Sequence, residues 1–369
     1  MKMKKILSVS FLICLLNSYS SSIWLQQYSG SKQESEEEKK FAKIYKKWRK
    51  EYLLPKNATE LELKSSFPSE DLIEKDIYLW GAHFIANDSF GNIYVSNRKA
   101  HFILKFDPSG HFLQKIGRKG QGPGEFKTPG RVMTGKDFLA VHDRMNRRIQ
   151  FFDQKGNYVK SIKLYKTFRD MTMNEEGLIF ATPILMTSQM PLIDVLSQDG
   201  KLLYSFGKPI RFKRSWDHLN DVLLDLNKKG ELLLAFRHFP IVRKYSVKGE
   251  LLAEYQIDHF KWKEYGKENR KRVSRQGGSK GYLITIEGIK GSDEGFYLLN
   301  IRPRIEILEF DKNGKLIMDY WNLYVRLRYS TEDFIVQKRH NENIFYILQQ
   351  RSEGMKVCIY GQKPKNKYK

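Results

Sequence analysis

The chain has 369 residues, with 65 Lys and Arg against 42 Asp and Glu, and a net charge of +23. So strong a positive charge favours polyanionic partners, such as nucleic acid, anionic lipid, acidic polysaccharide or a phosphate-rich envelope surface. Two cysteines are too few for a disulfide-rich scaffold, so the fold needs a hydrophobic core of its own.

The first 22 residues are predicted to be a secretory signal peptide. Three lysines precede an apolar run over residues 6–16, and small polar residues follow it. The run is too short to span a bilayer as a mature helix. Lipid attachment through Cys14 is an alternative, but the bulky Ile13 before it departs from the small residue usual at that position. The sequence therefore predicts a secreted or periplasmic protein.

Export and removal of the signal peptide bear on the cysteine count, the net charge and the expected partner. Only Cys358 would remain after cleavage, so no intramolecular disulfide can form, and its apolar surroundings predict a small buried side chain. Loss of the three leader lysines leaves +20 of the net charge of +23. An exported protein does not meet intracellular nucleic acid, so we expect no nucleic acid as the partner.

Residues 23–59 are predicted to be a linker that contains a short amphipathic helix. Within residues 31–52, apolar side chains recur at spacings of 3 and 4, and the segment begins acidic and ends basic, which suits a helix dipole. These side chains are Phe41, Ile44, Tyr45, Trp48 and Tyr52. The helix is expected to be a tether, and its aromatic and basic residues leave a membrane-surface role open.

A repeated plan of short apolar strands and turns begins after this linker. One series of turns ends in glycine, at intervals of 46, 44, 49 and 65 residues. The glycines are Gly110, Gly156, Gly200, Gly249 and Gly314. Units of about 40 to 50 residues with several strands each are typical of propeller blades. Six such units can be counted along the chain.

The most regular part of the repeat carries a resemblance to a known family. The strand IYVSN, the following KAHFILKFDPSG and the loop GRKGQGPGEFKTP at residues 117–129 are similar to NHL repeats. The chain as a whole resembles the secreted bacterial six-bladed β-propeller proteins built from such repeats, most specifically over residues 84–160. In the loop, Phe126 is expected to plug an apolar seam. No helix follows, so the glycines are not expected to cradle a phosphate.

The ends of the repeat region predict how the ring closes. Residues 57–67 alternate between apolar and polar side chains and predict a strand, whereas the last unit shows three strands. An N-terminal strand that completes the last blade would remove the open sheet edges. The prediction is an all-β fold, a six-bladed β-propeller over residues 60–362 with a basic tail at 363–369. We expect a monomer.

Residues 261–280 are strongly basic and form an insertion between the fourth and fifth blades. We expect a basic loop that projects from one face, where insertions often contact partners. Its basic side chains are Lys263, Arg270, Lys271, Arg272 and Arg275. The alternative is a solvated loop without a partner.

The innermost strands, aligned by their apolar cores, begin with residues that could form a ring at the mouth of the central channel and bind a ligand there. The leading residues are His83, Arg131, Asp170, Asp221, Leu283 and Asp333. If a metal is present, the carboxylates of Asp170, Asp221 and Asp333 would suit Ca²⁺. The alternative is a water-filled mouth with no cofactor. His142 and Asp143 fall in a repeated step and are expected to be part of the blade structure.

The sequence predicts a binding or scaffold module rather than an enzyme. One face of the propeller would recognise an anionic, saccharide or protein partner of the cell envelope, with the basic surface as an electrostatic guide. Trp216, Trp262 and Trp321 are expected in loops, where their rings could stack on sugars. The alternative is a metal-dependent hydrolase or lyase, by resemblance to lactonase-like and amidating-lyase propellers, which hold a metal at the channel.

Overall fold

The computed structural model describes most of the chain from residue 57 onwards. The described ranges are 57–135, 138–184, 190–212, 217–274, 282–293, 295–301, 305–322, 331–340, 342–351 and 354–364. The predicted signal peptide, the amphipathic helix, Cys14, Arg275 and the end of the basic tail lie outside these ranges.

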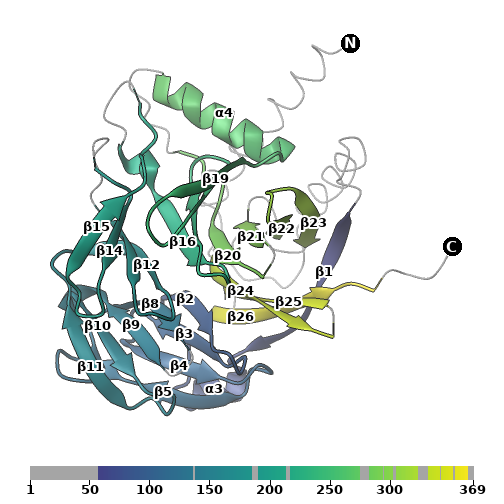
Figure 1. Ribbon diagram of the computed structural model, residues 1–369. Helices are drawn as coiled ribbons and strands as arrows, with labels where there is room; N and C mark the ends of the chain where they lie inside the picture. The colour runs from purple at the N-terminus through teal and green to yellow at the C-terminus, as the bar shows by residue number, and fades with distance from the viewer. Residues whose placement is uncertain are drawn as a thin grey trace, which may run out of the picture.

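Four-stranded antiparallel units follow one another along the chain and surround a common axis, as Figure 1 shows. Blade 1 contains β2 (Ala82–Asn87), β3 (Ile93–Asn97), β4 (Phe102–Phe106) and β5 (Phe112–Ile116). Blade 2 contains β8 (Pro129–Thr134), β9 (Leu139–Asp143), β10 (Arg148–Phe152) and β11 (Tyr158–Lys163). Blade 3 contains β12 (Phe168–Met173), β13 (Ile179–Pro183), β14 (Ile193–Leu196) and β15 (Leu202–Phe206).

The second half of the chain continues the same plan. Blade 4 contains β16 (Val222–Leu226), β17 (Leu232–Phe236), β18 (Ile241–Tyr245) and β19 (Leu251–Gln256). Blade 5 contains β20 (Gly288–Gly291), β21 (Gly295–Asn300), β22 (Ile305–Asp311) and β23 (Leu316–Asn322). Blade 6 contains β24 (Thr331–Arg339), β25 (Glu342–Arg351), β26 (Gly354–Gln362) and β1 (Ala58–Phe67). The predicted six-bladed propeller is confirmed.

Burial follows the position of each strand within its blade. The second strands β3, β9 and β17 are buried along their whole length, because each blade packs against two neighbours. β17 is accordingly a continuous apolar run, whereas β3 and β9 begin with three apolar or aromatic residues and end with two buried polar ones. The outermost strands β5 and β19 instead alternate between more and less exposed side chains. The hydrophobic core therefore lies between the blades rather than in one central mass.

The N-terminal strand closes the ring as predicted. β1 pairs antiparallel with β26, from Leu61 opposite Gln362 to Phe67 opposite Val357. It also pairs in parallel with β23 of blade 5, where Ala58 lies opposite Asp319. Blades 5 and 6 are therefore joined into one eight-stranded sheet.

A contact that recurs between neighbouring blades is also present at the closure. Each glycine of the turn between the third and fourth strands has a positive φ and lies against the outermost strand of the preceding blade. A Cβ on Gly249 would come 2.7 Å from Phe206, and a Cβ on Gly110 would come 2.6 Å from Phe67 of β1. Since any side chain there would clash, these turns require glycine. β1 thus takes the place of a regular fourth strand.

The glycine-rich loop joins blades 1 and 2. Its two short strands, β6 (Arg118–Lys119) and β7 (Glu125–Phe126), pair with each other. Phe126 is fully buried between the two blades, with its ring centroid 5.6 Å from that of Phe152. The expected plug is therefore present. The Glu125 carboxylate accepts hydrogen bonds from two N–H groups of the loop, those of Gln121 and Gly122.

The described part of the basic insertion, residues 261–274, is helical rather than the predicted loop. α4 (Phe260–Ser274) lies on the outside of the blades (Figure 1). Trp262, Tyr265 and Asn269 are buried at spacings of 3 and 4, so one side of the helix packs on the propeller. The Asn269 amide donates to the carbonyls of His238 and Leu283 and accepts from the N–H of Leu283, which fixes the helix to blade 4.

The other helical elements within the described ranges are short. They are α3 (Glu70–Glu74), η2 (Arg144–Asn146) and η3 (Asp217–Asn220). No helix within the described ranges is long and apolar enough to cross a membrane.

The antiparallel plan gives the ring two different ends. Connections between the second and third strands, and those between blades, lie at one end of the strands, which we name the long-loop face. It carries the glycine-rich loop and α4. Turns between the first and second strands, and between the third and fourth, lie at the other end.

Closure by β1 can be tested with two leucines of that strand. Leu61→Ala should lower the free energy of unfolding by about 2–5 kcal/mol, because Leu61 is 1% exposed in the core shared by blades 5 and 6. Leu63→Ala, at a side chain that is 38% exposed, should cost about 1 kcal/mol or less. Urea denaturation measures both. Equal losses would contradict a sealed core under β1.

Candidate functional site

Three of the predicted channel residues meet inside the propeller. Arg131 of β8 donates from Nε and Nη2 to the two carboxylate oxygens of Asp170 on β12, both at 2.8 Å. Its Nη1 donates to Oδ2 of Asp333 on β24 at 2.9 Å. All three side chains are buried. Blades 2, 3 and 6 are thus joined by one guanidinium.

Backbone groups complete the bonding of the two carboxylates. The N–H of Leu224 in blade 4 donates to Asp170 at 3.0 Å, and the N–H of Ile85 in blade 1 donates to Asp333 at 3.3 Å. Burial by itself would lower the pKa of Arg131, but Asp170 and Asp333 outweigh it, so its pKa is raised and the charge is retained. The buried guanidinium is thus held between two carboxylates.

Three further residues belong to this group and were not predicted from the sequence. The guanidinium of Arg131 lies over the Phe84 ring, 4.5 Å from its centroid. Lys290 of β20 places Nζ 3.9 Å from Oδ1 of Asp333. Asp225 of β16 accepts a hydrogen bond from the Gly291 N–H at 2.8 Å. Burial raises the pKa of Asp225, although Lys290 acts in the opposite direction. All six innermost strands therefore contribute a residue. We name this set the channel network: Phe84, Arg131, Asp170, Asp225, Lys290 and Asp333.

Asp221 and His83 lie apart from the channel network. The β2, β8, β12 and β24 pairings each contain an irregularity beside the leading residue, and in β2 it is Phe84 rather than His83 that contacts Arg131. Such bulges re-aim a side chain. The β16 pairing with β17 is regular. The residue of β16 whose N–H contacts Asp170 is Leu224. Asp221 comes earlier in the chain than Leu224 and therefore lies nearer the mouth of the channel than Asp170. There it pairs with Arg169 at 2.5 Å and with Arg237 at 3.6 Å.

His83 and Leu283 also lie outside the ring of residues that was predicted at the channel mouth. The His83 imidazole meets the Phe84 ring edge-on, with centroids 4.6 Å apart. Leu283 is not on an innermost strand, because the first strand of blade 5 is β20, which begins at Gly288. The alignment of residues 283–287 with the other innermost strands was therefore wrong.

The arrangement bears on the predicted Ca²⁺ ligands. Asp170 and Asp333 share Arg131, whose guanidinium lies where a cation bound by both carboxylates would have to be. Asp221 is bound elsewhere. Within the described ranges, the one set of three His, Cys, Asp or Glu side chains with ligand atoms within 4.8 Å of one another is His259, Glu306 and Asp319. A metal at the channel stays a prediction.

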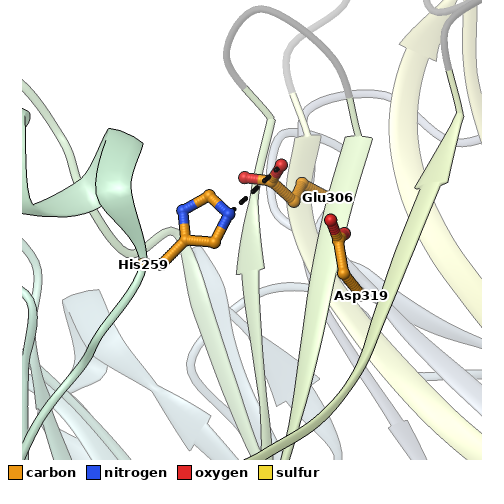
Figure 2. Close-up of side chains that lie close together, drawn as sticks. All are labelled: His259, Glu306 and Asp319. Atoms are coloured by element: carbon orange, nitrogen blue, oxygen red, sulfur yellow. Dashed lines mark ion pairs between the residues drawn. The ribbon is translucent and has the colours of Figure 1, made fainter. Parts of the chain in front are cut away.

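The set His259, Glu306 and Asp319 is buried under the start of α4. Figure 2 shows His259 turned toward Glu306, with Nε2 3.9 Å from Oε1, and Asp319 nearby. The other oxygen of Glu306 accepts a hydrogen bond from Trp262 Nε1 at 3.0 Å and forms an ion pair with Lys261. Because an ammonium group already neutralises Glu306, we interpret this cluster as the contact that seats α4 on blade 5.

The basic side chains of α4 are largely engaged by acidic neighbours. Lys263 pairs with Asp258 at 2.5 Å, and Arg272 pairs with Glu268 at 3.0 Å. Arg270 lies over the Phe239 ring, 5.0 Å from its centroid. Lys271 is in the last turn of the helix. The helix therefore carries less uncompensated positive charge than its sequence suggests.

The tryptophans predicted in loops are placed differently. Trp262 is fully buried in α4, and Trp321 lies on β23. Trp216 lies outside the described ranges. Neither of the two described rings belongs to a loop that could present it to a sugar.

His142 lies in β9 and is buried, with no hydrogen-bond partner at Nε2 in the described structure. Burial, and secondarily the positive charge of Arg144, lowers the pKa of His142 to about 3. The ring is therefore neutral at neutral pH.

The ion pairing inside the channel predicts a large effect of Arg131→Gln. It should reduce the free energy of unfolding by about 3–5 kcal/mol, because two buried carboxylates lose their partner. Arg118→Gln should cost about 1 kcal/mol or less, since the Arg118 side chain is 80% exposed beside Glu125. Adding Asp170→Asn and Asp333→Asn to Arg131→Gln should restore part of the loss. Equal urea midpoints for the two single variants would contradict this account.

The low pKa of His142 predicts a pH dependence. The unfolded chain takes up a proton near the ordinary value of 6.5, whereas the folded protein does so only near 3, so stability is lost as the pH falls through this window. Between pH 7 and pH 5, the wild type should lose about 2 kcal/mol relative to His142→Gln. Urea denaturation at both pH values measures the difference. Parallel pH profiles would show that His142 is not a buried neutral ring.

Comparisons with known proteins agree with this fold. The family model described as a 6-bladed beta-propeller, DUF5128, matches residues 85–202. No curated protein matches the chain.

Solved structures resemble most of the chain. A candidate exported protein of Bacteroides fragilis is 11% identical with a TM-score of 0.56, over 84% of this chain and 99% of that one. A member of the duf4221 family from Bacteroides vulgatus is 12% identical with a TM-score of 0.56, over 85% and 100%. A streptogramin B lyase is 15% identical with a TM-score of 0.48, over 83% and 89%. Such low identities show the fold alone, and the finer resemblance to NHL repeats stays a prediction. The chain is a six-bladed β-propeller.

Proposed function

We propose that the protein is an exported, monomeric binding module that recognises an anionic, saccharide or protein partner of the cell envelope through its long-loop face. The observation that carries the proposal is the mutual neutralisation of charge in the channel network. Asp170 and Asp333 are bound by Arg131 and by backbone N–H groups. A catalytic metal site instead needs carboxylates directed at an ion that keeps an open position for substrate.

The long-loop face supports partner recognition because it carries the connections of irregular length. The link from blade 1 to blade 2 contains the glycine-rich loop, and the link from blade 4 to blade 5 contains α4. The turns at the other end of the strands are short and repeat the same backbone bonding, as at Gly110 and Gly156. Loops of varied length on a rigid scaffold are the usual carriers of recognition.

The net charge of +23 supports an anionic partner. A positive field attracts polyanions and accelerates their association, and export directs the choice toward acidic polysaccharides and acidic proteins of the envelope rather than nucleic acid. Export itself rests on the signal-peptide pattern of the first 22 residues.

The face can be tested with two triple variants of equal charge change and polygalacturonate as the probe. Lys99→Glu, Lys119→Glu and Lys208→Glu alter exposed lysines of the long-loop face. Lys155→Glu, Lys201→Glu and Lys312→Glu alter exposed lysines of turns at the other end of the strands. The first triple variant should weaken binding about tenfold more than the second, measured by biolayer interferometry.

Two results would count against the proposal. Equal weakening by both triple variants would show a response to net charge alone, without a binding face. Stoichiometric Ca²⁺ or Zn²⁺ in the purified protein, lost in Asp170→Asn, would favour the alternative of a metal-dependent hydrolase or lyase.

A further inference from the structure

Two arginines at the channel mouth have no carboxylate partner among the residues that the structure describes. Arg98 directly follows β3 and Arg144 directly follows β9, so they occupy the same position in blades 1 and 2. Both side chains are half-buried, and within the described ranges no ion pair involves either of them. Arg237 occupies the same position in blade 4, but it pairs with Asp221 and Glu287.

Backbone contacts bring the loops of the two arginines to one short segment. The Thr128 N–H donates to Nδ1 of His101 at 3.0 Å, which ties the loop after Arg98 to the entry of β8. The Met145 N–H donates to the Lys127 carbonyl at 3.1 Å, which ties the turn that starts at Arg144 to the same entry. Arg98 and Arg144 therefore flank residues 127–130.

The lack of a side chain at Gly130 leaves the space that the Arg144 side chain occupies. A Cβ on Gly130 would come 2.9 Å from Cδ and 3.0 Å from Cγ of Arg144. The side chain thus lies across the start of the innermost strand of blade 2, immediately before Arg131. Arg169 lies on the neighbouring innermost strand, immediately before the Asp170 that Arg131 binds. Its own carboxylate partner is Asp221.

The electrostatics within this cluster are unfavourable. Burial, followed by the positive charges of Arg98 and Arg169, lowers the pKa of Arg144. The Nε of Arg144 is buried without a hydrogen-bond acceptor in the described structure. Unsatisfied buried donors and like charges cost stability. An acceptor with negative charge would remove both costs.

We propose that Arg98 and Arg144 bind an oxyanion, the carboxylate or phosphate group of the partner, at the mouth of the channel. Guanidinium groups match the paired oxygens of such groups and form strong charge-assisted hydrogen bonds with them. The nearby positive charge of Arg169 adds to the electrostatic attraction of the anion. This inference deepens the proposed function and rests on it.

Isothermal titration calorimetry of the full chain tests the site, with D-galacturonate, inorganic phosphate and galactose as probes. Galactose differs from galacturonate in lacking the carboxylate. The wild type should bind galacturonate or phosphate saturably and should not bind galactose. Arg98→Gln and Arg144→Gln should each weaken the anion about tenfold or more. Lys155→Gln removes the same charge from a turn at the other end of the strands and should leave affinity unchanged.

Two further variants separate the anion site from a structural role. Gly130→Ala keeps all the charges but displaces Arg144, and it should weaken the same anion. Arg144→Gln should leave the urea midpoint of the ligand-free protein unchanged or raised, since the unsatisfied arginine destabilises the fold. A lowered midpoint together with unchanged anion affinity would show that Arg144 is structural and would overturn the proposal.

The outcomes also separate this inference from the proposed function. Stronger binding of galacturonate supports an acidic saccharide or peptide carboxylate, and stronger binding of phosphate supports a phosphorylated partner. No saturable binding of either anion, or equal binding by Arg144→Gln, overturns the oxyanion site. If polygalacturonate binding still depends on the lysines of the long-loop face, the inference fails while the proposed function stands.

Discussion

The pairing of β1 with β26 is the constraint on which the rest of the structure depends. The channel network joins residues that are far apart in the chain, since Arg131 and Asp333 are separated by 202 positions. They can meet only if the last blade returns to the first. β1 secures this return with bonds on both of its edges, to β26 and to β23. The buried ion pairs are therefore a consequence of closure, and they in turn hold the inner strands together.

Much of the fold could be predicted because it repeats. Glycine-ended turns recur wherever a blade meets the outermost strand of its predecessor, and the contact between Gly110 and Phe67 extends this rule to the closing strand. α4 was missed because its buried side includes polar residues. Lys261 pairs with Glu306 and Asn269 caps backbone groups, so the apolar periodicity that predicts a helix is weak there. The start of β20 was also predicted wrongly. The residues between α4 and β20 have no counterpart in the other blades, so aligning them with the other innermost strands gave the wrong position.

The candidate site was predictable in part. Arg131, Asp170 and Asp333 were found because each leads an apolar strand, and a local irregularity beside each strand start turns the side chain into the channel. Bulges leave no clear mark in one sequence, so the regular pairing of β16, the strand that follows Asp221, could not be foreseen. Asp225 and Lys290 were missed because they do not lead their strands: each is the residue before the last one. That Arg98 and Arg144 have no carboxylate partner in the described part of the chain depends on the positions of distant carboxylates, which a linear pattern does not contain.

The two ends of the domain emerge side by side. The Lys363 N–H donates to the Glu60 carbonyl at 2.8 Å, so the chain enters β1 and leaves β26 at one place. That place is at the ends of the strands opposite the long-loop connections. An attachment made through either terminus would therefore hold the propeller at the end opposite the long-loop face. The channel mouth and its arginines would then be directed away from the anchoring point.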